Sequence, residues 1–228
     1  VGPEPDAQIW QRVEGAIARL PGLQGVLAVD PMRHLPGHGQ SAPLPAEVAG
    51  VPVLDFFAEL ALEPGERLRF APPGLNDVAA YYCTGGTTGL PKIARHSQRN
   101  EVIFCGQLDA VIGAPVLRPG RTVLTALPLF HVNALIGCGL AAFAQGGHVL
   151  LAPPAGFRTP GFMPRFWEIV ETHQVSSYSA VPTVYAGLLQ VPCAGHDTSS
   201  LTVAICGAAP MPRDLPVSYT HLTLPTKA

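Results

Sequence analysis

The chain has 228 residues, 47% of them hydrophobic and 13% charged, and its 14 Lys and Arg against 16 Asp and Glu give a net charge of -2. This composition suits a globular protein with a sizeable core and excludes an intrinsically disordered chain, which needs many charges and few apolar residues. The basic residues are spread singly, whereas binding to a nucleic-acid backbone needs clustered cations, so we expect a small-molecule partner and no nucleic acid.

Three features of the sequence predict a cytoplasmic protein. The five cysteines are odd in number, widely spaced and without a CxxC pair, which favours buried free thiols in a reducing compartment over disulfides or a metal site. The first residues lack the basic and apolar regions of a signal peptide. The most apolar stretch, 134–144, is shorter than the ~20 residues that cross a bilayer, so no transmembrane segment is expected. The oligomeric state stays open.

Short apolar segments alternate along the chain. A helix is predicted at 7–20, a strand at 26–29, an irregular segment at 31–46, and a strand leading into a helix at 52–62. Further strands are predicted at 77–82, 92–95, 121–127, 147–151, 176–179 and 203–206, and helices at 100–112, 134–144, 162–173 and 183–190. This order predicts an α/β fold of mostly parallel strands with crossover helices on both faces.

The last segment, 217–228, does not continue this pattern. It resembles the translation of a transposon-type sequencing adapter, the other interpretation being a small terminal strand. We therefore predict one partial domain at 1–216 and a non-native tail at 217–228. We expect the native protein to continue past Pro216 and, since the chain lacks an initiator Met, to begin earlier.

A cluster of glycine, threonine and lysine follows the strand at 77–82. It consists of Thr84, Gly85, Gly86, Thr87, Thr88, Gly89, Leu90, Pro91 and Lys92. Glycines let backbone N–H groups approach anionic oxygens, and the threonine hydroxyls add donors. The ammonium of Lys92 against a phosphate at ~4 Å would contribute roughly 4 kcal/mol at an effective dielectric constant of 20. The pattern indicates a polyphosphate-binding loop, although an exposed hairpin turn is the simpler alternative.

The P-loop of nucleotide triphosphatases and kinases is the nearest competing motif. There the lysine directly follows the last glycine, and a Ser or Thr comes next to hold Mg²⁺. Here Leu90 and Pro91 separate Gly89 from Lys92, and Ile93 follows. The spacing therefore argues against a P-loop ATPase or kinase.

The same segment resembles the phosphate loop of the adenylate-forming superfamily, which includes acyl-CoA synthetases, luciferases and peptide-synthetase adenylation domains. The family usually has Thr-Ser-Gly-Thr-Thr-Gly-x-Pro-Lys, so Gly85 replaces a serine here. The replacement removes one hydroxyl donor but keeps the backbone donors. Arg95-His96 and Asn100 also lie in a stretch similar to the one that follows this loop in the family.

Two further segments resemble family motifs in the expected order. The segment 127–133, Leu-Pro-Leu-Phe-His-Val-Asn, implies that His131 borders the carboxylate pocket and the ATP site. The turn at 206–212 implies a wall against adenine made of Gly207, Ala208, Ala209 and Pro210. Between them, 177–185 resembles the strand and helix start beside the acyl tunnel, where acyl contact and core packing explain Val181 and Tyr185 equally well. The resemblance covers 77–215 well and the first seventy or so residues only in general pattern.

The resemblance implies part of the large N-terminal domain of an AMP-forming acyl-CoA synthetase. Such an enzyme joins a carboxylic acid to AMP with release of pyrophosphate from Mg²⁺-ATP, and coenzyme A then displaces AMP. The family's Mg²⁺-binding Glu, ribose-binding Asp and catalytic Lys of the C-terminal domain are expected beyond Pro216, so no catalytic or metal-binding residue is predicted here. We therefore expect this chain alone to have little or no ligase activity.

Two alternatives remain for the activity. One is an acyl-AMP ligase that loads a carrier protein, and the other is a truncated, non-catalytic product. The small residues at 137–142 favour a fatty or other hydrophobic acid as substrate.

Overall fold

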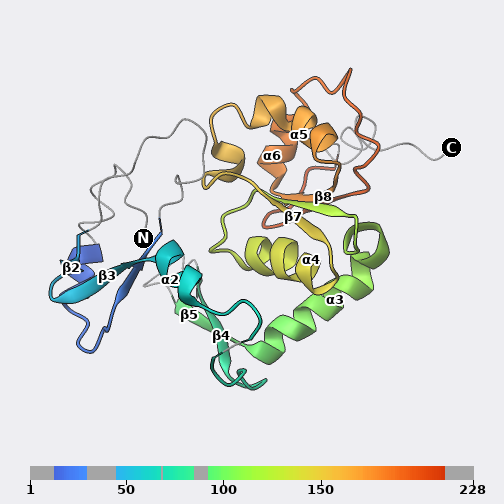
Figure 1. Ribbon diagram of the computed structural model, residues 1–228. Coiled ribbons are helices and arrows are strands. Elements are labelled where there is room, and N and C mark those ends of the chain that lie inside the picture. Colours follow the sequence, from blue (N-terminus) through green and yellow to red (C-terminus); the bar gives the residue numbers. More distant parts are fainter. Residues whose placement is uncertain (1–12, 30–44, 68, 85–91, 214–228) are drawn as a thin grey trace. The chain divides into compact units, whose positions relative to one another are not determined.

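A computed structural model describes residues 13–29, 45–67, 69–84 and 92–213, and the account of the structure is confined to these (Figure 1). The chain divides into two compact units, 1–72 and 73–228, which are treated separately. The prediction that 1–216 forms one partial domain stays a prediction, and the tail at 217–228 lies outside the described residues.

The first unit contains a small three-stranded sheet. Its strands are β1 (Val26–Ala28), β2 (Glu47–Val48) and β3 (Val51–Asp55), in the order β1-β3-β2. β1 runs parallel to β3, and β2 runs antiparallel to it. Ile17, Val26 and Val48 form the buried core of this unit.

The predicted elements of the first unit are found where they are described. Residues 13–17 are helical, and the beginning of the predicted helix and most of the irregular segment at 31–46 lie outside the described residues. The segment 52–62 forms β3 followed by α2 (Phe56–Leu62), which Asp55 caps by accepting a 2.8 Å hydrogen bond from the backbone N–H of Ala58. The two-residue strand β2 was not predicted, because two residues are too few to show a period.

A four-stranded parallel sheet is the centre of the second unit. Its strands are β6 (Thr122–Thr125), β7 (His148–Leu151), β8 (Val175–Ala180) and β9 (Val203–Cys206), in the order β7-β6-β8-β9. All three pairings are parallel. All six residues of β8 are buried, as expected of a central strand covered on both faces.

Helices cover both faces of this sheet (Figure 1). On one face Leu124 and Tyr178 pack with α5 (Phe166–Thr172) and α6 (Pro182–Leu188) in a core rich in aromatic side chains. On the other face Val123 packs with α3 (Gln98–Val116), η1 (Asn133–Leu140) and α4 (Ala141–Ala144). Successive residues of β6 therefore belong to the cores on opposite faces of the sheet. The predicted α/β architecture with helices on both faces is confirmed.

An antiparallel hairpin, β4 (Val78–Thr84) with β5 (Lys92–Ser97), precedes the sheet and leads into α3. A capping box fixes the start of α3. The backbone N–H of Ser97 donates to Asn100 Oδ1 at 2.9 Å, and the backbone N–H of Asn100 donates to Ser97 Oγ at 3.3 Å. The helix continues past the predicted end at 112, but Gly113 has non-helical angles, so the regular part ends near the predicted boundary.

Local geometry differs from prediction in two of the other three helical segments, whereas the predicted helix at 183–190 is found as α6. The predicted helix at 134–144 consists of a π-helical stretch, η1, followed by one α-helical turn, α4. The predicted helix at 162–173 begins with a 3-10 turn, η3 (Met163–Arg165), before α5. A further 3-10 turn, η2 (Gly156–Arg158), was not predicted, because 152–161 has no periodicity.

The sequence predicted which faces of these helices are buried better than it predicted whether they are α-, 3-10 or π-helical. Trp167 and Val170 of α5 are fully buried, while the side chains of Glu168 and Glu171 are exposed. No helix among the described residues is long and apolar enough to cross a membrane.

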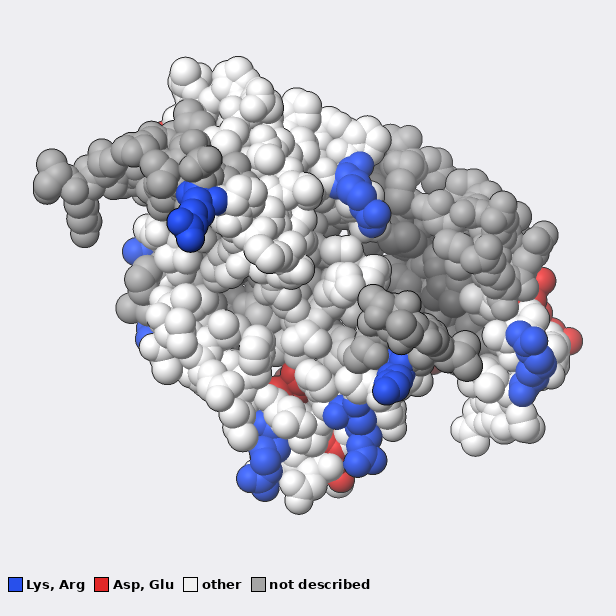
Figure 2. All heavy atoms as spheres, turned by 180° about the vertical axis from the view of Figure 1, so that it is seen from behind, with Lys and Arg blue, Asp and Glu red and all other residues white. Residues whose placement is uncertain are grey.

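The cysteines are free, as predicted, but they are not all buried. Cys105 and Cys138 are buried, Cys193 and Cys206 are half-buried, and Cys83 is exposed. Cys83 alternates along β4 with the buried Tyr82, so it lies on the opposite face of the hairpin. On the face of the molecule shown in Figure 2, the described Lys and Arg side chains stand apart or in small groups and form no continuous basic patch.

Candidate functional site

A cavity of about 620 Å³ lies where three parallel strands end. Residues 126–128 follow β6, Ala180 and Val181 lie at the end of β8, and Gly207 and Ala208 follow β9. In open α/β sheets the carboxyl ends of the strands share one edge, where ligands commonly bind. The lining residues are Ala126, Leu127, Pro128, Phe130, His131, Asn133, Ala155, Phe157, Arg158, Ala180, Val181, Thr183, Val184, Gly207 and Ala208.

Hydrogen bonds hold the segments of this edge together. The backbone N–H of Gly207 donates to the carbonyl oxygen of Ala180 at 3.1 Å, which joins the turn after β9 to the end of β8. Asn133 Nδ2 donates to Ser179 Oγ at 2.8 Å, which joins the start of η1 to the same strand. The cavity wall is therefore tied directly to the sheet, as a preorganised binding site requires.

The η2 turn is fitted closely against the end of β6. The backbone N–H of Phe157 donates to the carbonyl oxygen of Ala126 at 3.2 Å, and Gly156 has a φ of +55°. A Cβ on Gly156 would lie 2.0 Å from that same oxygen. Only glycine permits this approach, which puts the side chains of Phe157 and Arg158 at the cavity.

His131 lies in a turn between β6 and η1. Its backbone N–H donates to the carbonyl oxygen of Pro128 at 3.0 Å, and its ring centroid is 4.5 Å from that of Phe130. Both residues are exposed and line the cavity, and Phe130 is 70% exposed. The imidazole is thus available to a ligand at the carboxyl edge of the sheet.

The turn after β9 has an unusual backbone. Ala208 has a φ of +68°, a left-handed conformation that is costly for a residue with a Cβ. Such strain is often found at functional sites. Of the four residues predicted against adenine, Gly207 and Ala208 are among the lining residues of the cavity, whereas the exposed Ala209 and Pro210 are not.

The predicted phosphate loop is described only at its ends. Thr84 ends β4 and Lys92 begins β5, and the two are cross-strand partners. Gly85, Gly86, Thr87, Thr88 and Gly89 lie outside the described residues. Lys92 is exposed and is not among the described residues that line the cavity.

Val181 and Tyr185, which the sequence left undecided, have different environments. Val181 lines the cavity. Tyr185 is 1% exposed, stacks on Tyr178 at 5.5 Å, and donates its hydroxyl hydrogen to the carbonyl oxygen of Ile205 at 2.8 Å. Core packing therefore explains Tyr185, and Val181 is the residue available to a ligand.

Sequence reasoning missed several lining residues. Asn133 and Thr183 belong to segments that resemble family motifs, but no role was assigned to them. Phe157 and Arg158 lie in the aperiodic η2 turn, where the only signal was a glycine among prolines.

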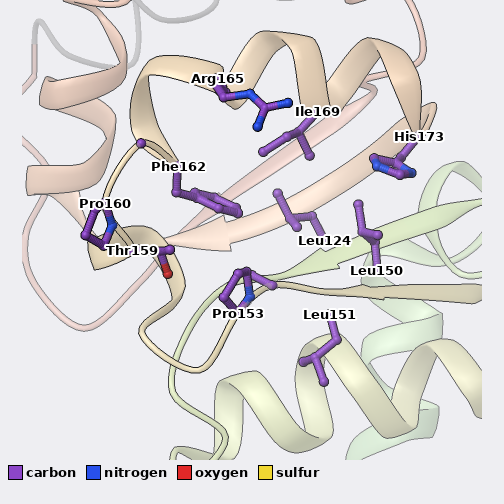
Figure 3. Close-up of a pocket in the computed structure, with 12 residues that line it drawn as sticks. Leu124, Leu150, Leu151, Pro153, Thr159, Pro160, Phe162, Arg165, Ile169 and His173 are labelled. Atoms are coloured by element: carbon purple, nitrogen blue, oxygen red, sulfur yellow. The ribbon is translucent and has the colours of Figure 1, made fainter. Parts of the chain in front are cut away.

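A second cavity, of about 320 Å³, lies over the sheet between β6, β7 and α5 (Figure 3). Its interior is formed mainly by apolar side chains such as Leu124, Leu150 and Phe162. The Arg165 guanidinium near it is engaged by Glu168 in two hydrogen bonds of 2.8 and 2.7 Å. None of the sequence-predicted site residues is among its described lining, so we assign the candidate site to the larger cavity.

The described residues contain no group of three or more His, Cys, Asp or Glu side chains that could hold a metal ion.

Comparison with curated proteins identifies several acyl-CoA ligases. The chain is 40% identical over 175 residues to marinolic acid–CoA ligase of Pseudoalteromonas sp. (strain SANK 73390), covering 75% of this chain and 26% of the relative. It is 31% identical over 166 residues to a long-chain-fatty-acid–CoA ligase of Yersinia pestis, covering 71% of this chain and 28% of the relative. The chain thus spans about a quarter of the length of these relatives.

Solved structures share the fold. The anthranilate CoA ligase AuaEII, in complex with anthranoyl-AMP, aligns with a TM-score of 0.72 at 21% identity, covering 95% of this chain and 38% of that one. The N-terminal domain of FACL13 from Mycobacterium tuberculosis aligns with a TM-score of 0.66 at 23% identity, covering 92% of this chain and 51% of that one. The sequence pattern of the family described as "AMP-binding enzyme" matches residues 22–223, and the chain therefore belongs to that family.

Proposed function

We propose that this chain is the part of an AMP-forming acyl-CoA ligase that binds ATP and the carboxylic acid. The main observation in its support is that residues from three separate motifs line one cavity at the carboxyl edge of the parallel sheet. They are His131, Val181, Gly207 and Ala208. Relatives named as CoA ligases, and a structural neighbour that contains an acyl adenylate, support this function.

The reaction takes place in two displacements. A carboxylate oxygen attacks the α-phosphorus of ATP, the bond from that phosphorus to the bridging oxygen breaks, and pyrophosphate leaves. The sulfur of coenzyme A then attacks the acyl carbon, and AMP leaves. Both steps depend mainly on positioning and on stabilisation of the developing negative charge.

Each predicted site residue has a role in this proposal. Thr84, Lys92 and the loop between them bind the β- and γ-phosphates, which become the leaving group. His131 and Val181 border the carboxylate and the acyl chain. The turn that begins with Gly207 and Ala208 lies against adenine, where small side chains let a flat base approach the backbone.

The acid and the acceptor are part of the proposal as well. The mainly apolar lining of the cavity suits a fatty or other hydrophobic acid. Coenzyme A is proposed as acceptor in preference to a carrier protein because the relatives above are named CoA ligases. Free cysteines accord with a reducing compartment, and we propose the cytoplasm.

Nucleotide binding by the purified chain tests the proposal. Isothermal titration should show tighter binding of ATP than of AMP, because only ATP carries the β- and γ-phosphates. Lys92→Ala should weaken ATP binding about tenfold, equivalent to ~1.4 kcal/mol, and leave AMP binding unchanged. Arg165→Ala is the control, since Arg165 lies at the second cavity and should not affect either nucleotide. A chain that binds neither nucleotide, or equal losses for ATP and AMP in Lys92→Ala, would contradict the proposal.

A further inference from the structure

A buried carboxylate lies behind the β4–β5 hairpin. Glu101, in the first turn of α3, has a side chain that is only 11% exposed. Its Oε1 lies 2.9 Å from Nδ1 of His96 on β5. Its Oε2 is buried and has no hydrogen-bond partner among the described residues. A buried carboxylate needs a compensating partner, and His96 is the partner that the structure provides.

Tyr82 connects this pair to the other strand of the hairpin. Its ring centroid lies 4.9 Å from that of His96, and the residue is 8% exposed. Tyr82 pairs with Ala94 and His96 pairs with Ala80, so the two rings are diagonal neighbours on one face of the hairpin. Tyr82, His96 and Glu101, which we call the hairpin cluster, therefore tie β4, β5 and α3 together.

The negative charge of Glu101 acts on its neighbours. Burial, and then the charge of Glu101, raise the pKa of Tyr82. The same two causes, in the same order, raise the pKa of Cys105, which lies one turn further along α3. Both groups therefore stay protonated near neutral pH, and neither adds a second negative charge beside Glu101.

The position of the hairpin cluster suggests its purpose. Two residues after Tyr82, β4 ends at Thr84, and four residues before His96, β5 begins at Lys92. Thr84 and Lys92 are cross-strand partners, so the angle of the hairpin against α3 determines where these two strand ends lie. A solvent-exposed pair would contribute little to the position of the hairpin. The carboxylate of Glu101 is largely buried, so breaking its contact with His96 should disturb the packing of the hairpin on α3.

We propose that Tyr82, His96 and Glu101 are positioning residues, which hold the β4–β5 hairpin against α3 so that Thr84 and Lys92 meet the terminal phosphates of ATP. This inference rests on the proposed function. It assigns no contact between these three residues and the nucleotide.

The test compares ATP with AMP in variants of the purified chain. Glu101→Ala should weaken ATP binding about tenfold, equivalent to ~1.4 kcal/mol, because the hairpin no longer holds Lys92 in place, and should leave AMP binding unchanged. Glu101→Gln keeps an acceptor for His96 and should restore most of the ATP affinity. Hydrogen exchange should rise in 78–84 and 92–97 of Glu101→Ala, and stay as before in β6 and β8.

A second Glu–His pair provides a matched control. Glu171 Oε2 lies 2.9 Å from His196 Nδ1, with side chains that are 41% and 34% exposed, away from the hairpin. Glu171→Ala should change the affinity for either nucleotide by less than about twofold. If Glu101→Ala does not fold, His96→Gln, which also removes the ring contact with Tyr82, is expected to give the same selective loss.

The outcomes separate this inference from the function on which it rests. If the unmodified chain binds neither nucleotide, the proposed function fails, and the inference fails with it. If the unmodified chain prefers ATP but the variants lose stability without any change in the ratio of ATP to AMP affinity, the function stands and the hairpin cluster is merely structural.

Discussion

Replacement of Gly156 by alanine tests the close fit that shapes one wall of the cavity. The new Cβ would lie 2.0 Å from the carbonyl oxygen of Ala126, and contacts below 3.0 Å are not found for real Cβ atoms, so the two segments must separate by about 3.0 - 2.0 = 1.0 Å. Gly156 also has a φ of +55°, which costs an alanine about 1–2 kcal/mol. Overpacking adds about 1–3 kcal/mol, so we expect the free energy of unfolding to fall by about 2–5 kcal/mol in total.

The control for this prediction is Gly161→Ala. Gly161 has a φ of +79°, but a Cβ there meets nothing within 4 Å, so only the backbone cost of about 1–2 kcal/mol applies. Urea unfolding followed by tryptophan fluorescence measures the free energy of unfolding of both variants. In thermal unfolding, a chain of this size should lose about 2–4 °C in Tm for each kcal/mol of stability. Equal losses in the two variants would refute the steric argument, because they share the left-handed backbone and differ only in the contact.

Two further predictions concern the core and a helix start. Burial raises the pKa of Cys138 from 9.0 to about 11, so the folded chain keeps this proton while the unfolded chain releases it. Stability should therefore be constant below pH 9, fall by ~2–3 kcal/mol between pH 9 and 11, and fall less in Cys138→Ala; equal pH profiles in urea unfolding would contradict this. Ser97→Ala removes the cap of α3 and should cost ~1 kcal/mol, whereas Ser97→Asp should cost little; equal shifts in the urea midpoint would show that the cap is unimportant.

Structural features that depend on residues close together in the chain were predicted well from the sequence. Alternating apolar segments are local, and short crossovers between parallel strands allow few arrangements, so the α/β sheet with helices on both faces followed directly. The spacing of Gly89 and Lys92 argued against a P-loop, and the order of three motifs indicated the family to which the chain belongs. Helix type was less predictable: the segment 134–144 is apolar in either geometry, and sequence period does not separate a π-helix from an α-helix over two turns.

The sequence by itself therefore determined the class of fold, the family and the candidate motifs, because each of these depends on short, local segments of the chain. Only the tertiary structure decided that His131, Val181 and Gly207 share one cavity, that Arg158 joins them, and that Tyr185 belongs to the core. It also decided that Glu101 is buried against His96 while Cys83 is exposed. These facts depend on which strand ends meet and which face a helix covers, and such contacts join residues that are far apart in the chain.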